Sequence, residues 1–294
     1  MSSTVKAHLA LFLVALIYGA NYSIAKVVLD GEYLQPLSFI VLRAGAGMLL
    51  FWLFHTLFVH ERLARKDLGR VVLCAAFGVA INQTFFFSGL KWTTPINASL
   101  IMTMTPILVL IISAMLLGER INSRKIIGII LGASGAILLI SYGRIIQFLP
   151  NQLLGNILVF INAMSYGLYI VLVKGLMSRY HPVTVVKWVF IFGFLMVLPL
   201  GSQGLINTDW STFPPVVWLS IAYVLLGTTF LAYLLNATAL VQVNASVVSI
   251  YIYLQPLMAG VIALAWGKES IDWVKTVSAL LIFAGVYLVS TRNK

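Results

Sequence analysis

The run INASLIMTMTPILVLIISAMLL, residues 96–117, decides what kind of fold this chain can adopt. It contains no charged residue, and it is long enough to cross a bilayer, because a spanning helix needs about 20 mostly apolar residues. No water reaches the backbone inside a bilayer, so such a segment satisfies its own N–H and C=O groups by forming an α-helix. The run therefore predicts a transmembrane helix.

Similar apolar runs recur along the whole chain and are separated by short polar connections. In one connection, Gly201 to Phe213, residues of the types Gly, Ser, Asn, Asp and Pro cluster, so we expect a loop there. The pattern predicts an all-α integral membrane protein with ten transmembrane helices. The predicted spans are 7–28, 36–59, 69–90, 96–117, 124–142, 153–174, 182–201, 214–239, 245–266 and 271–291.

The composition agrees with a membrane protein and excludes other classes. Hydrophobic residues make up 61% of the chain and charged residues 9%, whereas soluble domains carry about 25% charged residues. The net charge of +11 does not indicate a nucleic-acid partner, since the basic residues lie mostly in the gaps between apolar runs. The single cysteine, Cys74, excludes an intrachain disulfide framework and a cysteine-rich metal site. We expect no metal and no cofactor.

The distribution of Lys and Arg predicts the orientation. If the N-terminus is cytoplasmic, most basic residues of the connections fall on the cytoplasmic side, which is the usual bias. An even number of spans then places both termini in the cytoplasm. The basic cluster Arg62, Arg65, Lys66 and Arg70 lies on this side, where it could contact anionic lipid. The first run is followed by no small-residue cleavage site, so we interpret it as a retained helix.

Motifs of the first half recur in the second half, in the same order and at a nearly constant separation. This predicts two repeats of five helices, residues 1–147 and 148–294. Because five is odd, the second repeat enters the membrane upside down, as in many secondary transporters. The recurring residues are Tyr18-Gly19 and Lys26 with Tyr166-Gly167 and Lys174; Pro36 with Pro182; and Ser99, Pro106, Glu119 and Gly135 with Ser249, Pro256, Glu269 and Gly285.

These motifs, with the Gly-rich span after Glu119, resemble the EamA family of the drug/metabolite transporter superfamily. The resemblance covers nearly the whole chain, although Gly267-Lys268-Glu269 departs from the simpler Gly118-Glu119 spacing. It implies a multi-pass protein of a cell (inner) membrane that exports small metabolites, often amino acids or related compounds, by alternating access. It also implies a cavity lined by spans one, three, four, six, eight and nine, with spans five and ten at the periphery, where they could support a homodimer.

Polar side chains inside the predicted spans are the candidates for a substrate site. An unpaired amide or hydroxyl is costly in lipid, so we expect these groups to face the interior. Hydrogen bonds between helices are the alternative role for any one of them. The candidates are Tyr18, Asn21, Arg43, Asn82, Gln83, Phe86, Ser99, Thr103, Asn162, Tyr166, Tyr169, Tyr233, Asn236, Ser249 and Tyr253.

Arg43 is the candidate with a charge deep inside a span. A charge in the hydrocarbon region is costly, so it faces a cavity or a partner. Arg43 therefore binds substrate or acts in gating, or else it bonds helix carbonyls in a structural role. Lys187 lies nearer a span end and could snorkel. No Asp or Glu lies deep in a span, which disfavours a buried proton relay and favours substrates that carry a carboxylate.

Two prolines, Pro106 and Pro256, lie in the middle of matching spans. Each removes a backbone donor and can kink its helix, so the pair could act as gates or form static bends.

Two other function classes are alternatives to a transporter. A membrane-embedded enzyme would need a buried carboxylate pair, a His-rich metal set or a nucleophile motif, none of which the sequence contains. A non-transporting scaffold or receptor would have little reason to keep matched polar residues in both repeats.

Overall fold

The computed structural model describes residues 3–93, 95–142, 150–265 and 272–291, and the regular structure in these ranges is helical. Ten helices or helix groups within them are long and apolar enough to cross a membrane, which confirms the predicted membrane fold. The predicted repeat boundary at 147/148 and the predicted motif residue Glu269 lie outside the described residues.

Some spans are single helices, and others consist of consecutive segments. The single helices are α1 (Ser3–Asp30), α2 (Pro36–Phe58), α7 (Ser123–Ser141), α8 (Leu153–Met177), α9 (Pro182–Ile206) and α14 (Trp273–Ser290). The segmented spans are α3 (Leu68–Ala75), η2 (Ala76–Ala80) and α4 (Ile81–Trp92); α5 (Pro95–Met102) and α6 (Thr105–Leu117); α10 (Pro215–Tyr223), η5 (Val224–Leu231) and α11 (Ala232–Gln242); and α12 (Ala245–Ile250), η6 (Tyr251–Tyr253) and α13 (Leu254–Ala265). Short 3-10 turns are η1 (Arg65–Asp67), η3 (Pro150–Gln152) and η4 (Trp210–Thr212).

The predicted loop from Gly201 to Phe213 is wrong in its first part. Helix α9 continues to Ile206, so the connection begins only after it. Gly201 lies inside the helix because α9 runs very close to α2 there: a Cβ at this position would collide with the backbone of Leu37. The glycine permits close helix contact and does not end the helix.

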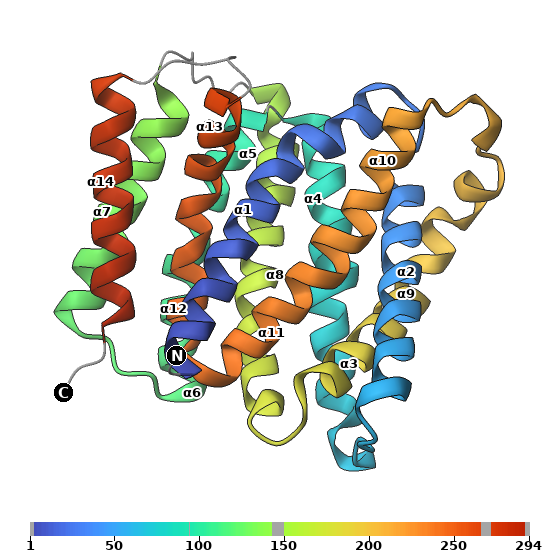
Figure 1. Ribbon diagram of the computed structural model, residues 1–294, viewed down its shortest axis with the longest axis horizontal. Coiled ribbons are helices and arrows are strands. Elements are labelled where there is room, and N and C mark those ends of the chain that lie inside the picture. Colours follow the sequence, from blue (N-terminus) through green and yellow to red (C-terminus); the bar gives the residue numbers. More distant parts are fainter. Residues whose placement is uncertain (1–2, 94, 143–149, 266–271, 292–294) are drawn as a thin grey trace.

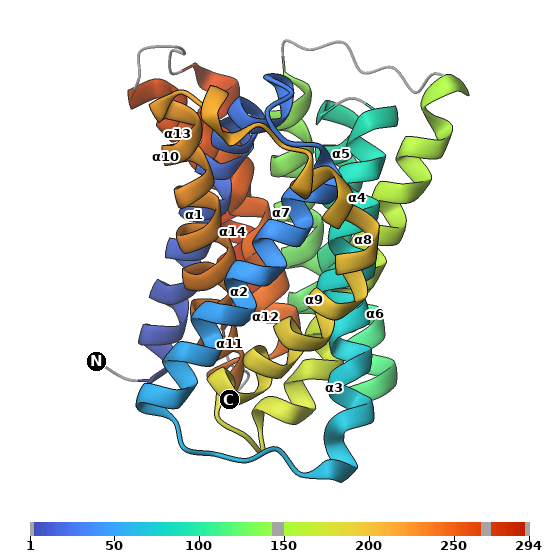
Figure 2. The same ribbon diagram turned by 90° about the vertical axis from the view of Figure 1, so that its right-hand side faces the viewer.

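The first helix begins and the last helix ends on the same face of the bundle. The start of α1 and the end of α14 lie at the lower side of Figure 1, which we call the terminal face. The opposite face carries the connections from α1 to α2 and from α9 to α10 (Figures 1 and 2). Which face is cytoplasmic stays a prediction from the basic residues.

Helices of the two halves pack as matched pairs. Helix α2 lies along α9, and α7 lies along α14 (Figure 1). The contact of α4 with α8 has its counterpart in that of α1 with α11, and the contact of α6 with α8 in that of α1 with α13. A twofold axis in the membrane plane that relates the two halves would produce these pairs. The packing therefore supports the predicted inverted repeat.

The glycines of α7 form the close contact with α14 that their small size suggests. A Cβ on Gly285 would lie 2.6 Å from the backbone nitrogen of Gly132, and one on Gly128 would lie 2.8 Å from the Gly285 oxygen. Gly135 meets the backbone oxygen of Ser278 in the same way. Small residues thus let the two backbones touch.

Helix irregularities occur at matching places in the two halves. The third and eighth spans contain the π-helical segments η2 and η5. The fourth span is interrupted at residues 103–104, and the ninth by the 3-10 turn η6. Pro106 and Pro256 follow these interruptions, as expected for residues without a backbone donor. Such irregularities often mark functional positions in helices.

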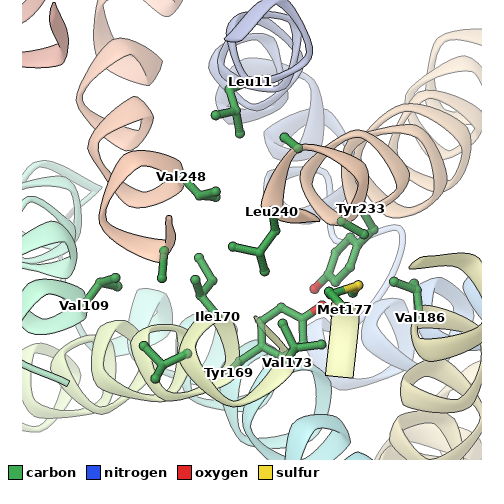
Figure 3. Packing of buried hydrophobic residues seen from close by; sticks show 14 of the residues in the cluster. Leu11, Val109, Tyr169, Ile170, Val173, Met177, Val186, Tyr233, Leu240 and Val248 are labelled. Carbon is green, nitrogen blue, oxygen red and sulfur yellow. The ribbon is translucent and has the colours of Figure 1, made fainter. Parts of the chain in front are cut away.

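A buried apolar cluster fills the space between the helices on the terminal side. Figure 3 shows Leu11, Val109, Ile170, Leu240 and Val248 in this cluster, which we call the apolar plug; they come from α1, α6, α8, α11 and α12. All five are nearly inaccessible to solvent. The interior of the bundle is therefore closed toward the terminal face in this conformation.

Candidate functional site

Four tyrosines from three helices meet directly above the apolar plug. Tyr18 of α1, Tyr166 and Tyr169 of α8 and Tyr233 of α11 line one small cavity together with Asn236. The ring centroids of Tyr166 and Tyr169 are 6.3 Å apart, and those of Tyr169 and Tyr233 are 6.5 Å apart (Figure 3 shows the latter pair). We call these residues the tyrosine cluster. It contains predicted site residues from both halves of the chain.

The cavity within the tyrosine cluster is about 20 Å³ in volume, which is room for about one water molecule. A metabolite does not fit in this conformation. Since the terminal side is filled by the apolar plug, ligand entry requires helices to move apart.

The glycines of the Tyr-Gly motifs position two of these tyrosines. A Cβ on Gly19 would lie 2.9 Å from the Gln255 oxygen and 2.8 Å from the Met258 Cβ, so α1 touches α13 beside Pro256. Gly167 faces Val109 and Ile112 in the matching place, although less tightly: a Cβ there would lie 3.3 Å from Ile112 Cδ1 and 3.5 Å from Val109 Cγ2. Each Tyr-Gly motif therefore lies against the interrupted helix of the other half.

Tyr169 and Tyr233 are held by the π-helical part of the third span. A Cβ on Gly78 would collide with the Tyr169 ring, so that glycine leaves the space the ring fills. The Tyr233 hydroxyl donates to the Gly78 carbonyl at 3.1 Å. A π-helical turn leaves such carbonyls poorly bonded within the helix, which explains why a side chain can bond one.

Arg43 is buried beside the tyrosine cluster with only 8% of its surface exposed. Its Nε donates to the Thr229 hydroxyl in η5 at 3.2 Å, and its guanidinium carbon lies 5.7 Å from the centre of the Phe87 ring. Tyr18 and Tyr233 are close enough to interact with its charge. Among the described residues no carboxylate forms an ion pair with Arg43.

Asn82 and Asn162 join α4 to α8. The Asn162 amide donates to the Asn82 carbonyl at 2.7 Å, and the Asn82 amide donates to the Asn162 carbonyl at 3.4 Å. These two candidates therefore bond helices together, the alternative role stated for them. The Asn162 side-chain oxygen has no partner in the part of the chain that the structure describes.

The two helix interruptions touch each other. The Tyr253 hydroxyl donates to the Thr103 carbonyl at 2.9 Å, and a Cβ on Gly132 would meet the Tyr253 ring. Thr103 and Tyr253 occupy corresponding positions of the fourth and ninth spans. Residues that correspond and also touch lie on the proposed twofold axis, so the two interruptions are in direct contact with each other.

The remaining candidates are dispersed around this centre. Gln83 lies beside the Tyr233 hydroxyl, and Phe86 packs on Phe87 with ring centroids 5.4 Å apart. Ser249 is buried and donates within its own helix to Ser246. Asn21 and Ser99 are half-buried on α1 and α5, outside the residues that line the small cavity.

Two functional contacts were absent from the sequence expectations. Thr229, the partner of Arg43, is one of two adjacent threonines in an apolar span. Two neighbouring hydroxyls in such a span could have indicated a buried polar partner. Lys174, known from the sequence only as a repeat of Lys26, bonds the carbonyls of Leu240 and Val243 at the end of α11 with its ammonium group. A cation at a helix C-terminus interacts favourably with the helix dipole.

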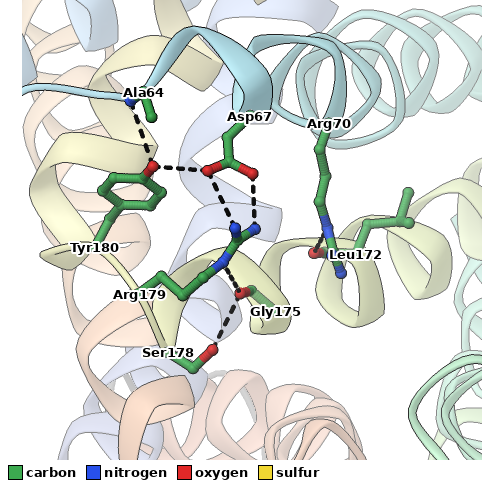
Figure 4. Close-up of polar contacts among 8 residues, drawn as sticks. All are labelled: Ala64, Asp67, Arg70, Leu172, Gly175, Ser178, Arg179 and Tyr180. Carbon is green, nitrogen blue, oxygen red and sulfur yellow. Dashed lines mark hydrogen bonds and ion pairs between the residues drawn. The ribbon is translucent and has the colours of Figure 1, made fainter.

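A polar cluster lies at the terminal face beside these helices (Figure 4). The Asp67 carboxylate accepts from both terminal nitrogens of Arg179, at 2.8 and 3.1 Å, and from the Tyr180 hydroxyl at 2.7 Å. This hydrogen bond raises the pKa of Tyr180, because ionisation of the phenol would remove the donor beside a carboxylate. Arg70 adds a bond to the Leu172 carbonyl. The cluster links the start of the third span to the connection between α8 and α9.

Arg179→Gln is expected to loosen this linkage and to open the terminal side more often. Cys74, the single cysteine, is buried in α3 and reports such opening. We expect alkylation of Cys74 by a membrane-impermeant maleimide to become severalfold faster in the variant. Arg62→Gln, at an exposed cation of the neighbouring connection, is the control. Equal alkylation rates in both variants would show that the polar cluster does not hold the terminal side closed.

Comparisons with known proteins place this geometry in context. The model of the EamA-like transporter family matches residues 5–141 and 153–291. An uncharacterised transporter of Archaeoglobus fulgidus is 27% identical over 98% of each chain, and one of Bacillus subtilis is 26% identical over 92% of this chain and 89% of that one. A probable terminal-alkyne amino-acid exporter of Streptantibioticus cattleyicolor is 26% identical over 98% of this chain and 94% of its own.

A solved crystal structure shares the fold. It superposes with a TM-score of 0.77 at 18% sequence identity and covers 96% of this chain and 97% of its own. At this level of identity the similarity concerns the fold alone.

Proposed function

This chain belongs to the EamA-like transporter family, and from that premise we propose that it exports small carboxylate-bearing metabolites, amino acids or closely related compounds, by alternating access. The buried Arg43 carries the proposal. A guanidinium is a fork of five donors, and here one of them, Nε, bonds a neutral hydroxyl. A substrate carboxylate would supply the missing negative charge in the geometry that Arg prefers.

The tyrosine cluster supplies the rest of the proposed site. Its aromatic faces suit the apolar part of an amino acid, and the hydroxyls and Asn236 suit its polar groups. The Streptantibioticus cattleyicolor relative, named as a probable amino-acid exporter, adds support for this substrate class.

Alternating access is proposed from the relation between the halves. We assign the repeats to residues 1–147 and 148–294, with the second inverted. The matched helix interruptions at Pro106 and Pro256 are the proposed gates, linked through the bond from Tyr253 to Thr103. Exchange of the roles of the two halves would then open the site first on one face and then on the other.

The proposal also covers the membrane, the orientation in it and the contacts of the outer helices. The terminal face is assigned to the cytoplasm of a cell (inner) membrane, following the basic residues. Exposed apolar side chains of α7 and α14, such as Ile130 and Leu280, contact lipid or a second copy in a homodimer.

Flux in proteoliposomes tests the proposal. Purified protein would be assayed with labelled amino acids, nucleosides and sugars, with and without a pH gradient. We expect saturable amino-acid flux that Tyr166→Ala abolishes, while Tyr142→Ala, at an exposed tyrosine that directly follows α7, leaves it unchanged. Folded protein without flux of any of these classes would contradict the proposed substrate class.

A further inference from the structure

A second, much larger cavity opens on the opposite face, away from the tyrosine cluster. Its volume is about 680 Å³, and it lies between the connection from α1 to α2 and the end of α9 with η4. No function proposed above uses it. Its lining includes Glu32, Tyr33, Gln35, Ser38, Gly204, Asp209 and Phe213.

The charge of this cavity is negative. Glu32 and Asp209 line it from two different connections, and none of the described residues that line it is a Lys or Arg. One oxygen of Asp209, Oδ1, accepts from the backbone nitrogen and hydroxyl of Ser211 at 3.1 and 2.6 Å, which leaves the other oxygen available. In a chain with net charge +11, two carboxylates at one cavity give it a local potential that attracts cations.

The floor of the cavity holds an acceptor that has no partner. Ser38 is 1% exposed, and its hydroxyl lacks a hydrogen bond to any described residue. A buried hydroxyl without a partner is unfavourable, and an occupant of the cavity would relieve that cost. The hydroxyl points toward Gly204: a Cβ there would collide with Ser38 Oγ and lie 3.1 Å from Gln35 Oε1. Helix α9 therefore approaches α2 closely at Gly204, and the two oxygen acceptors of Ser38 and Gln35 lie close together there.

The wall of the cavity is aromatic. Tyr33 and Phe213 both line it, and their rings meet edge to face with centroids 5.3 Å apart. Aromatic faces attract ammonium groups, and they do so best where the cation is partly desolvated. Carboxylates, hydroxyl and amide oxygens and aromatic rings together match an organic ammonium ion.

We propose that this cavity binds small organic molecules that carry an ammonium group. A bare metal ion is a poorer match, because hard cations need several oxygens at 2–2.6 Å around one point and the cavity is far larger. Within the described residues no group of three or more His, Cys, Asp or Glu converges as such a site requires. The ammonium is that of a transported amino compound at the outer opening or that of a separate amine in the medium.

Thermal unfolding of the purified full-length protein tests the proposal without any transport step. The probe is 1,4-diaminobutane, and 1,4-butanediol is the neutral molecule of the same length. We expect saturable stabilisation by the diamine and none by the diol, at matched ionic strength. The fluorescence of Trp210, whose ring centroid lies 5.3 Å from that of the cavity residue Phe213, gives a second readout.

Variants locate the binding. Glu32→Gln combined with Asp209→Asn should weaken diamine binding at least tenfold, and Gly204→Val should abolish it, because the new side chain would collide with Ser38 and displace its hydroxyl. Ser38→Ala should weaken diamine binding severalfold. It removes an atom and introduces no clash, so it tests the same contact if Gly204→Val does not fold. Glu61→Gln, at a carboxylate of the terminal face, should leave it unchanged. Equal stabilisation by the diol, or unchanged affinity in the double variant, would overturn the proposal.

Flux distinguishes the two sources of the ammonium group. If the site receives the transported compound, Glu32→Gln with Asp209→Asn changes the concentration dependence of flux measured from the opposite face. If it receives a separate amine, the diamine alters flux in the native protein without being carried. Failure of the proposed export activity leaves the binding measurement intact, so the two proposals fail separately.

Discussion

Arg43→Gln is expected to raise the substrate concentration for half-maximal flux by roughly thirtyfold or more. Removing one partner of a buried, hydrogen-bonded charge pair costs about 2–5 kcal/mol, and about 1.4 kcal/mol corresponds to a factor of ten. The guanidinium lies beside Tyr18 and Tyr233, where the proposed substrate would bind. In Arg43→Gln, the substrate carboxylate would therefore lose its charged partner. Flux of a labelled amino acid in proteoliposomes measures the effect.

Lys187→Gln is the matched control for this experiment. Lys187 is also buried, with 9% of its surface exposed, but it lies 3.3 Å from His55 and away from the tyrosine cluster. The control should retain flux. A structural role for Arg43 predicts another pattern: Arg43→Gln and Thr229→Val would then lower thermal stability alike, with flux per folded molecule unchanged. That pattern would contradict substrate binding by Arg43.

Gly285→Ala is expected to destabilise the protein by about 1–3 kcal/mol, the range for overpacking a close contact. The added Cβ would lie 2.5 Å from the Gly128 oxygen and 2.6 Å from the Gly132 nitrogen. Backbone atoms of α7 cannot move aside as a flexible side chain can, so α14 must shift outward. Residual folded protein after heating, measured by size-exclusion chromatography in detergent, gives the loss.

Gly260→Ala makes the same substitution where the structure has room. Gly260 lies in α13, and no atom lies within 4 Å of a Cβ built there. Alanine is favoured over glycine in a helix by about 1 kcal/mol, so this variant should be as stable as the native protein or slightly more stable. Equal loss in both variants would mean that the contact of α7 with α14 is looser than described.

Much of the fold was predictable because the bilayer leaves few choices. Apolar runs of about 20 residues must form helices in lipid, so the spans follow from composition alone. The error at Gly201–Phe213 has the same origin: glycine indicates a loop locally, but here it serves the contact with α2, which composition does not encode. The π-helical segments η2 and η5 had no sequence expectation, since they depend on how neighbouring helices bond.

The candidate site was also predictable only in part. The free-energy cost of an unpaired polar group in lipid predicts that such groups face the interior, but it does not predict which of them line the same cavity. Tyr18, Tyr166 and Tyr233 meet because Gly19, Gly167 and Gly78 allow close approach between distant segments. Asn82 and Asn162 bond helices together although their residue types suit a ligand equally well.

Hydrophobic length and repeated motifs can be read along the chain, so a ten-span membrane protein with two related halves was predictable without any contact between helices. Three features depend on the tertiary structure: the tyrosine cluster closed over the apolar plug, the absence of a carboxylate beside Arg43 among the described residues, and the acidic cavity on the opposite face. Each depends on contacts between residues far apart in the chain, and those contacts are set by how closely the helix backbones can approach.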